Sequence, residues 1–127
     1  MQDLKAAIEK ELVDGKLPCA RAFNLADRLH INPVSIGQLA TQESIKISHC
    51  QLGLFGYPEG KRPVENMKNR VTDQLKNAVL SQLVDGQLPC AVAWKIALDF
   101  DVPKMQVAAA AEKLGLRIRE CQLGCFT

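Results

Sequence analysis

The chain has 127 residues, of which 47% are hydrophobic and 24% are charged, and its formal net charge is +2. This composition is typical of a soluble globular protein, and the near-neutral charge gives no strong electrostatic argument for nucleic acid or membrane binding. No apolar run reaches the roughly 18–20 residues that cross a bilayer, and the N-terminus has no apolar signal core, so we expect a cytoplasmic protein.

An amphipathic stretch begins the chain. Apolar residues at helical spacing predict a helix over residues 3–14. We expect Asp14-Gly15 to end it, because glycine accepts the left-handed backbone common just after a helix. Pro18 suits the first turn of a second helix, which we expect to extend to about Leu29.

A short break and a third helix come next. Asn32 can cap this helix and Pro33 can begin it, and the apolar spacing continues to about Thr41. The alternation of apolar and polar residues over 45–48 then predicts a short strand. A closing segment, CQLGLFG, turns at glycine and adds apolar anchors.

Between this unit and the next, Pro58, Gly60 and Pro63 predict a loop. No helix-breaking residue then occurs until Gly86, and apolar residues recur at helical spacing. We therefore predict one continuous helix over about residues 64–85, which connects the two halves and begins the second one.

The second half repeats the first. Residues 4–56 align with 75–127 without a gap, and 20 of the 53 aligned pairs are identical. This self-similarity indicates a duplicated structural unit, and units of about 50 residues are marginally stable alone. We expect the copies to pack together or to dimerise. The chain then divides into a first repeat at 1–56, a linker at 57–71 that leads into the long helix, and a second repeat at 72–127.

Both repeats carry a pattern that resembles the helix-turn-helix family. The first has a small residue, a turn residue and a β-branched residue at Ala26, His30 and Ile36, and the second matches them with Ala97, Asp101 and Val107. The family usually has glycine at the turn, so His30 and Asp101 indicate a looser turn. A helix before the motif and a strand after it resemble a winged helix. The resemblance implies a mainly α fold with short β-strands, built from two tandem helix-turn-helix, winged-helix-like modules.

The resemblance also implies a DNA-binding transcriptional regulator whose third helices enter the major groove of double-stranded DNA. Lysines and arginines of the linker at 61, 62, 68 and 70 could reach the phosphate backbone. The candidate nucleic-acid-binding residues are Asn32, Ser35, Gln38, Thr41, Gln42 and Lys46 in the first repeat, and Lys104, Gln106, Lys113, Arg117 and Arg119 in the second.

Other features favour a different class of function. Phosphate contacts by lysine and arginine normally supply much of the affinity for DNA, yet residues 30–45 contain neither. The third helix of the second repeat contains four alanines at 108–111. The alternative is a non-catalytic protein–protein interaction or sensor module on the same fold, with another protein as partner.

The five cysteines admit three interpretations. Cys19, His49 and Cys50 could gather around a metal, but the second repeat has Glu120 in place of the histidine and the spacings match no familiar zinc pattern. Cys19 and Cys50 could form a redox switch. Free cysteines are also commonly small buried hydrophobes, and we expect that here, with only Cys125 exposed. Because no catalytic constellation is present, we expect no enzyme, no cofactor and no metal.

Overall fold

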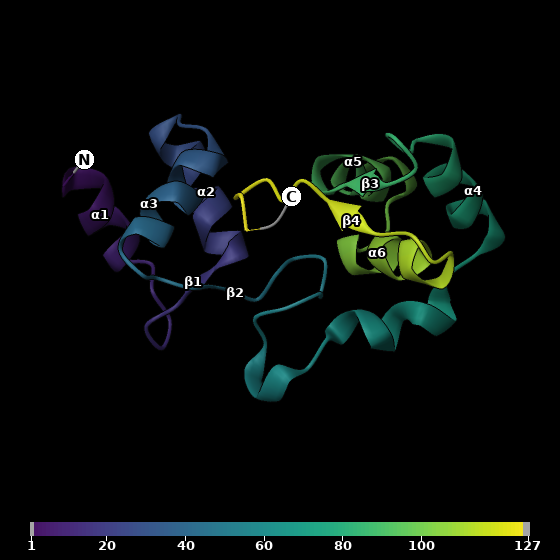
Figure 1. The fold of residues 1–127 in the computed structure, drawn as a ribbon, viewed down its shortest axis with the longest axis horizontal. Helices are drawn as coiled ribbons and strands as arrows, with labels where there is room; N and C mark the ends of the chain where they lie inside the picture. Colours follow the sequence, from purple (N-terminus) through teal and green to yellow (C-terminus); the bar gives the residue numbers. More distant parts are fainter. Residues whose placement is uncertain (1, 126–127) are drawn as a thin grey trace.

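The computed structural model describes residues 2–125, and each repeat forms a small helical module (Figure 1). The first module contains α1 (Gln2–Glu9), β1 (Leu17–Pro18), α2 (Cys19–Leu29), α3 (Pro33–Gln42) and β2 (Ile47–Ser48). The second contains α4 (Asp73–Ser81), β3 (Leu88–Pro89), α5 (Cys90–Phe100), α6 (Lys104–Lys113) and β4 (Ile118–Arg119). Two 3₁₀ helices connect them, η1 (Pro58–Gly60) and η2 (Pro63–Arg70). The mainly helical fold with short strands is confirmed, and within residues 2–125 no helix has the length and apolar character to cross a bilayer.

The sequence LVDGKLPCA at residues 12–20, which recurs as LVDGQLPCA at 83–91, contains a tight turn rather than a helix end. Helix α1 already ends at Glu9, and Val13 and Lys16 exchange backbone hydrogen bonds of 2.7 and 3.0 Å. The two residues between them, Asp14 and Gly15, have φ values of 53° and 76°. Positive φ at both central positions is what a type I′ turn requires, and Asp-Gly is a preferred pair for it. The prediction of a helix to residue 14 was therefore wrong.

The strand after α3 was predicted, but its partner was not. Strand β2 pairs in parallel with β1, with Leu17 opposite Ile47, and β3 pairs in the same way with β4. The amide of Leu17 donates to the carbonyl of Lys46 at 2.9 Å. This pairing links the start of α2 to the chain after α3, so β2 does not belong to a separate hairpin wing. The structure thus shows a mainly helical module with a parallel strand pair and leaves a winged-helix arrangement unconfirmed.

The turn between α2 and α3 is tight in both modules. His30 and Asp101 cap the preceding helices with left-handed backbones, at φ 55° and 52°. The amide of Ile31 then donates to the carbonyl of Ala26 at 3.0 Å, and the second module repeats this bond. The expectation of a looser turn was wrong, because histidine and aspartate here adopt the conformation that glycine would adopt.

We expect His30→Gly to raise the free energy of unfolding by up to about 1 kcal/mol, because the left-handed conformation costs an L-residue about that much or more. The side chain of His30 is exposed, so its loss removes little packing. Urea denaturation measures the change. His30→Val places a β-branched residue at the same φ and should lower stability; equal stability of the two variants would contradict the strain argument.

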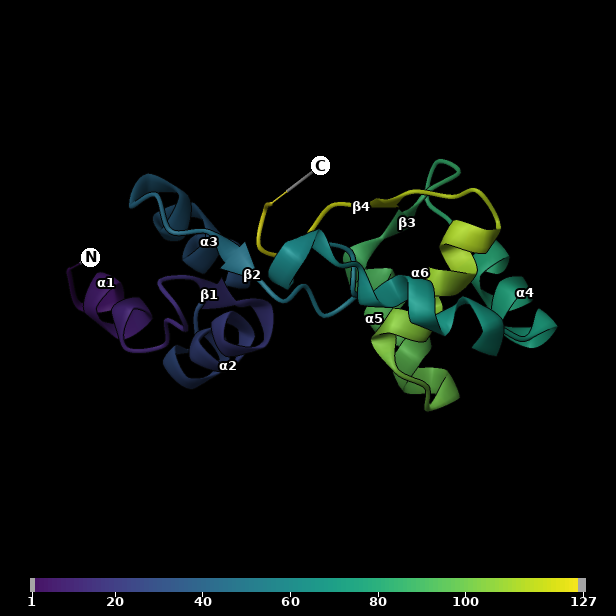
Figure 2. The same ribbon diagram turned by 90° about the horizontal axis from the view of Figure 1, so that it is seen from below.

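The predicted continuous helix over 64–85 is interrupted, which corrects that prediction. Val71 is extended, with φ −77° and ψ 128°, and Thr72 caps α4 by accepting a hydrogen bond from the amide of Leu75 at 3.2 Å. Residues before the cap form η2 instead of a further turn of α4. The interruption lets η2 fold back along α6, as Figure 2 shows.

The two modules exchange their closing segments, residues 50–53 and 121–124. Leu52 of the first repeat is buried in the core of the second module, beside Leu88 and Val107. Leu123 of the second repeat is buried in the core of the first module, beside Leu25 and Ile36. Figure 1 shows the C-terminal segment running from β4 back toward α2. Each core is therefore completed by the other repeat.

Candidate interaction groove on the first module

Helix α6 of the second module is covered by η2. Val64 of η2 is fully buried, and its amide donates to the carbonyl of Gly53 at 3.2 Å. The four alanines at 108–111 of α6 are also fully buried. An α-helix that packs against neighbours on several sides needs small side chains, which explains the alanine run. In this conformation α6 has no open face for a DNA groove.

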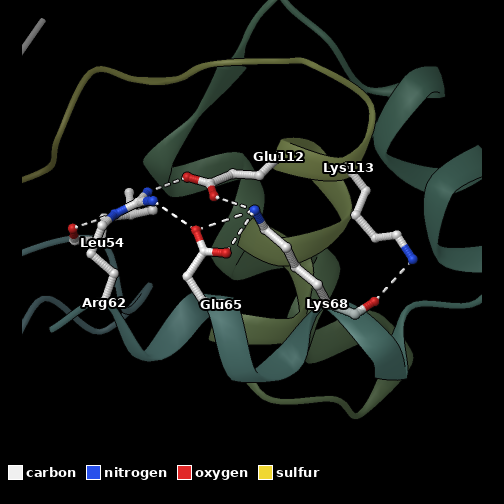
Figure 3. A network of polar contacts seen from close by, with 6 residues as sticks. All are labelled: Leu54, Arg62, Glu65, Lys68, Glu112 and Lys113. Atoms are coloured by element: carbon white, nitrogen blue, oxygen red, sulfur yellow. Dashed lines mark hydrogen bonds and ion pairs between the residues drawn. The ribbon is translucent and has the colours of Figure 1, made fainter.

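Polar contacts hold η2 on α6 through its backbone and its charges (Figure 3). Gln106 donates to the carbonyl of Arg70 at 3.1 Å. Figure 3 shows Lys113 donating to the carbonyl of Lys68, also at 3.1 Å. The carboxylate of Glu112 pairs with Arg62 and, at 3.3 Å, with Lys68. Helix α6 thus holds a short polypeptide segment by two hydrogen bonds to its carbonyls, by two ion pairs of Glu112 and by the burial of Val64.

The first module has a groove of about 500 Å³ at the corresponding place on α3. Three residues that line this groove occupy the repeat positions of residues that contact η2 or its N-cap Arg62. The corresponding pairs are Gly124 and Gly53, Thr41 and Glu112, and Gln42 and Lys113. Within residues 2–125, no further helix lies along α3 in the way that η2 lies along α6. The residues that line the groove are Val34, Gly37, Gln38, Thr41, Gln42, Leu123 and Gly124.

Gly37 allows the closing segment to form one wall of this groove. A Cβ at this position would lie 1.7 Å from the carbonyl oxygen of Leu123. The backbone of residues 123–124 therefore packs directly against α3, and only glycine permits this approach. The sequence analysis did not propose Gly37, Leu123 or Gly124 as site residues. One feature of the repeat could have indicated Gly37, because Ala108 at the matching position is also very small.

The structure places three of the predicted residues of the first repeat along the groove. Gln38, Thr41 and Gln42 are exposed on α3, and the hydroxyl of Thr41 also donates to the carbonyl of Gly37 at 2.9 Å. Asn32 caps α3 by accepting from the amide of Val34 at 3.1 Å, as predicted. The remaining two lie outside the groove lining: Ser35, half-buried on α3, and Lys46, exposed beside β2.

The predicted residues of the second repeat are mostly engaged within the chain. Lys104 lies 4.2 Å from the ring centroid of Trp94 and donates to Gln51 at 3.0 Å. Gln106 and Lys113 bind η2, as described above. The other two are exposed: Arg117, whose carbonyl accepts from Leu88, and Arg119, which donates to Gln87.

The groove on α3 is polar and uncharged. Its lining contains no ionisable side chain, and nearby Glu43 is paired with Lys5 at 3.2 Å. In the linker, Arg62 and Lys68 are paired with acidic residues rather than directed toward the groove. Phosphate binding would require cations that this face lacks, whereas amide and hydroxyl side chains suit backbone groups of a polypeptide.

The cysteines gather where the two modules meet. All five line a closed cavity of about 10 Å³, together with Phe23 and Trp94, whose ring centroids are 4.4 Å apart. The prediction of buried cysteines is confirmed for three of them; burial raises the pKa of the Cys19 thiol to about 11 and raises those of Cys50 and Cys90. Cys121 is partly exposed, and Cys125 is exposed as expected. Among residues 2–125, no group of three or more His, Cys, Asp or Glu side chains is arranged to hold a metal ion.

The geometry defines a mainly helical protein of two duplicated modules that share their cores and leave one groove open on α3. In comparisons with protein-family models, curated proteins and solved structures, no match to this chain was found.

Proposed function

We propose that this chain is a non-catalytic interaction module that binds a short polypeptide segment of a partner protein in the groove on α3. The observation that carries the proposal is internal to the molecule: the equivalent face of α6 holds η2. Because the two repeats arose from one sequence, a surface that binds a polypeptide in one copy is the best guide to the other.

The residues of the groove specify the chemistry of the segment. The carbonyl of Gly124 corresponds to that of Gly53 and would accept an amide from the partner, as Gly53 accepts one from Val64. Gln42 corresponds to Lys113 and would donate to a partner carbonyl. An apolar partner side chain would contact Val34 and Leu123. Since Thr41 replaces Glu112, the partner needs no basic residues.

A second candidate is DNA binding by the same helix, as in a transcriptional regulator. It is favoured by the tight turn at His30, the capped start of α3 and the exposed amides of Gln38 and Gln42, which could bond to base edges. Only α3 of the two predicted recognition helices is open, so a homodimer would be needed to read two half-sites. The lack of cations on α3 weighs against this candidate.

The test uses a synthetic peptide with the sequence of residues 61–72, KRPVENMKNRVT, added to the ¹⁵N-labelled full chain. We expect dose-dependent NMR shift changes at the amides of Val34, Gln38 and Gly124. The amides of α6 should not change, because the tethered η2 competes at a high effective concentration. A peptide carrying Val64→Asp should give no shifts.

Two protein variants control this experiment. Gln38→Trp should fill the groove and abolish the shifts, whereas Gln74→Trp, at an exposed glutamine of α4, should leave them intact. Absence of shifts with the native peptide would count against the proposed function. If duplex DNA moved the α3 resonances at physiological salt and the peptide did not, the DNA-binding candidate would replace it.

A further inference from the structure

We infer that Cys121 and Cys125 form a reversible dithiol–disulfide site, oxidised by hydroperoxides, on the loop that forms the wall of the α3 groove. This site differs from the Cys19–Cys50 pair that the sequence suggested. Formation of the disulfide stands independently of the proposed function, and only its effect on the groove rests on that function.

A tight turn brings the two thiols together. The amide of Gly124 donates to the carbonyl of Cys121 at 2.9 Å, and Gly124 has φ +81°. This reversal of the chain brings Cys125 back toward Cys121, and both residues line the same small cavity. A disulfide needs such proximity of its sulfur atoms. The first repeat has Leu54 at the position of Cys125, so only the second repeat carries the pair.

Accessibility and acidity separate this pair from the other cysteines. Cys125 is exposed and Cys121 is partly exposed, whereas the other three thiols are buried. The neighbouring Cys125 thiol lowers the pKa of Cys121 below its usual range, while burial raises the pKa of Cys19. Since the thiolate is the nucleophile, the more acidic Cys121 is the residue that reacts first.

The chemistry balances with one equivalent of hydroperoxide. The Cys121 thiolate attacks one peroxide oxygen, the O–O bond breaks, and the departing oxygen leaves as water or an alcohol after protonation. Cys121 is then a sulfenic acid. The sulfur of Cys125 attacks it, the S–S bond forms, and the sulfenic hydroxyl leaves as water with the Cys125 proton. The two thiols lose two electrons and the peroxide gains them.

A disulfide between Cys121 and Cys125 would affect the groove, because residues of the loop that it closes form the wall of the groove. Leu123 is buried in the first core, and Gly124 lines the groove beside Val34. A disulfide across residues 121–125 restricts the backbone that packs against Gly37. Oxidation therefore changes the wall of the groove, and we expect weaker binding of the polypeptide segment.

The first arm of the test measures disulfide formation in the full chain. The reduced protein is treated briefly with hydrogen peroxide, denatured, alkylated and digested with trypsin. Cleavage after Arg119 releases both cysteines in one peptide, residues 120–127. We expect this peptide to be unalkylated and lighter by two hydrogens, while Cys19, Cys50 and Cys90 are alkylated. Dithiothreitol should restore both thiols.

Two variants make the assignment specific. Cys125→Ser should stop at a sulfenic acid on Cys121 that dimedone traps, whereas Cys90→Ser should leave the internal disulfide unchanged. Oxidation of the buried cysteines at the same rate, or disulfides that join different peptides, would overturn the inference. The reduced wild-type protein needs no substitution, so a folding defect cannot hide the result.

The second arm repeats the peptide titration with reduced and oxidised protein. Binding that is at least several-fold weaker after oxidation supports the link to the groove, and equal binding overturns that link. If the disulfide forms but the reduced protein binds no peptide, the proposed function fails while the redox site stands.

Discussion

Leu123→Ala is expected to lower the free energy of unfolding by about 2–5 kcal/mol, the usual loss when a fully buried leucine is truncated. Leu123 is only 2% exposed, and it lies in the core of the first module although it belongs to the second repeat. The loss should therefore be greatest in α2 and α3. Urea denaturation gives the total, and amide hydrogen exchange shows where protection is lost.

Leu98→Ala is the matched control, because Leu98 is 82% exposed on α5. A substitution of an exposed side chain usually changes stability by no more than about 0.5 kcal/mol. Equal effects of Leu123→Ala and Leu98→Ala, or protection lost only around β4, would contradict the exchange of closing segments between the modules.

Gly37→Ala is the second large effect that we expect, with a loss of about 1–3 kcal/mol or more. In an ordinary helix interior this substitution stabilises by about 1 kcal/mol, so the sign itself is diagnostic. Here the new methyl group would lie 1.7 Å from the backbone oxygen of Leu123, and the closing segment would have to move. Thermal denaturation measures the change.

Gln38→Ala is the control for Gly37→Ala, because Gln38 is the next residue on α3 and is exposed. It should be neutral or slightly stabilising, since alanine has the higher helix propensity. A raised melting temperature for Gly37→Ala would show that the closing segment does not rest on α3. Gly37→Ala should also displace the closing segment, widen the groove and weaken peptide binding.

The sequence was sufficient to predict the local elements with clear caps. Helix α2 ends at Leu29 and α3 begins at Pro33 after Asn32, as the apolar spacing and capping residues indicate. Prediction from the sequence failed where a helix end depends on one polar capping side chain or on a hydrogen-bonded turn. Thr72 caps α4 and so ends the predicted long helix. Asp14-Gly15 forms a hairpin turn because Val13 and Lys16 exchange backbone hydrogen bonds across it.

The candidate groove could be predicted only in part. Gln38, Thr41 and Gln42 were candidate contact residues because the resemblance to helix-turn-helix proteins makes the third helix the binding helix and these side chains can form hydrogen bonds. Its wall comes from residues 123–124, more than 80 positions away, and no local pattern reports such a contact. Likewise, the alanines of α6 indicate a crowded helix, but the sequence does not identify η2 as the neighbour.

The exchange of closing segments has a consequence for biosynthesis. The first module lacks Leu123 from its core until the second repeat has left the ribosome, so the N-terminal half completes its folding only after the second repeat has been synthesised. Its contacts also span a large part of the chain, which slows folding relative to a helical unit with local contacts only. Two halves that look like separate domains in the sequence would then become stable together, and a cut between them would yield two incomplete cores.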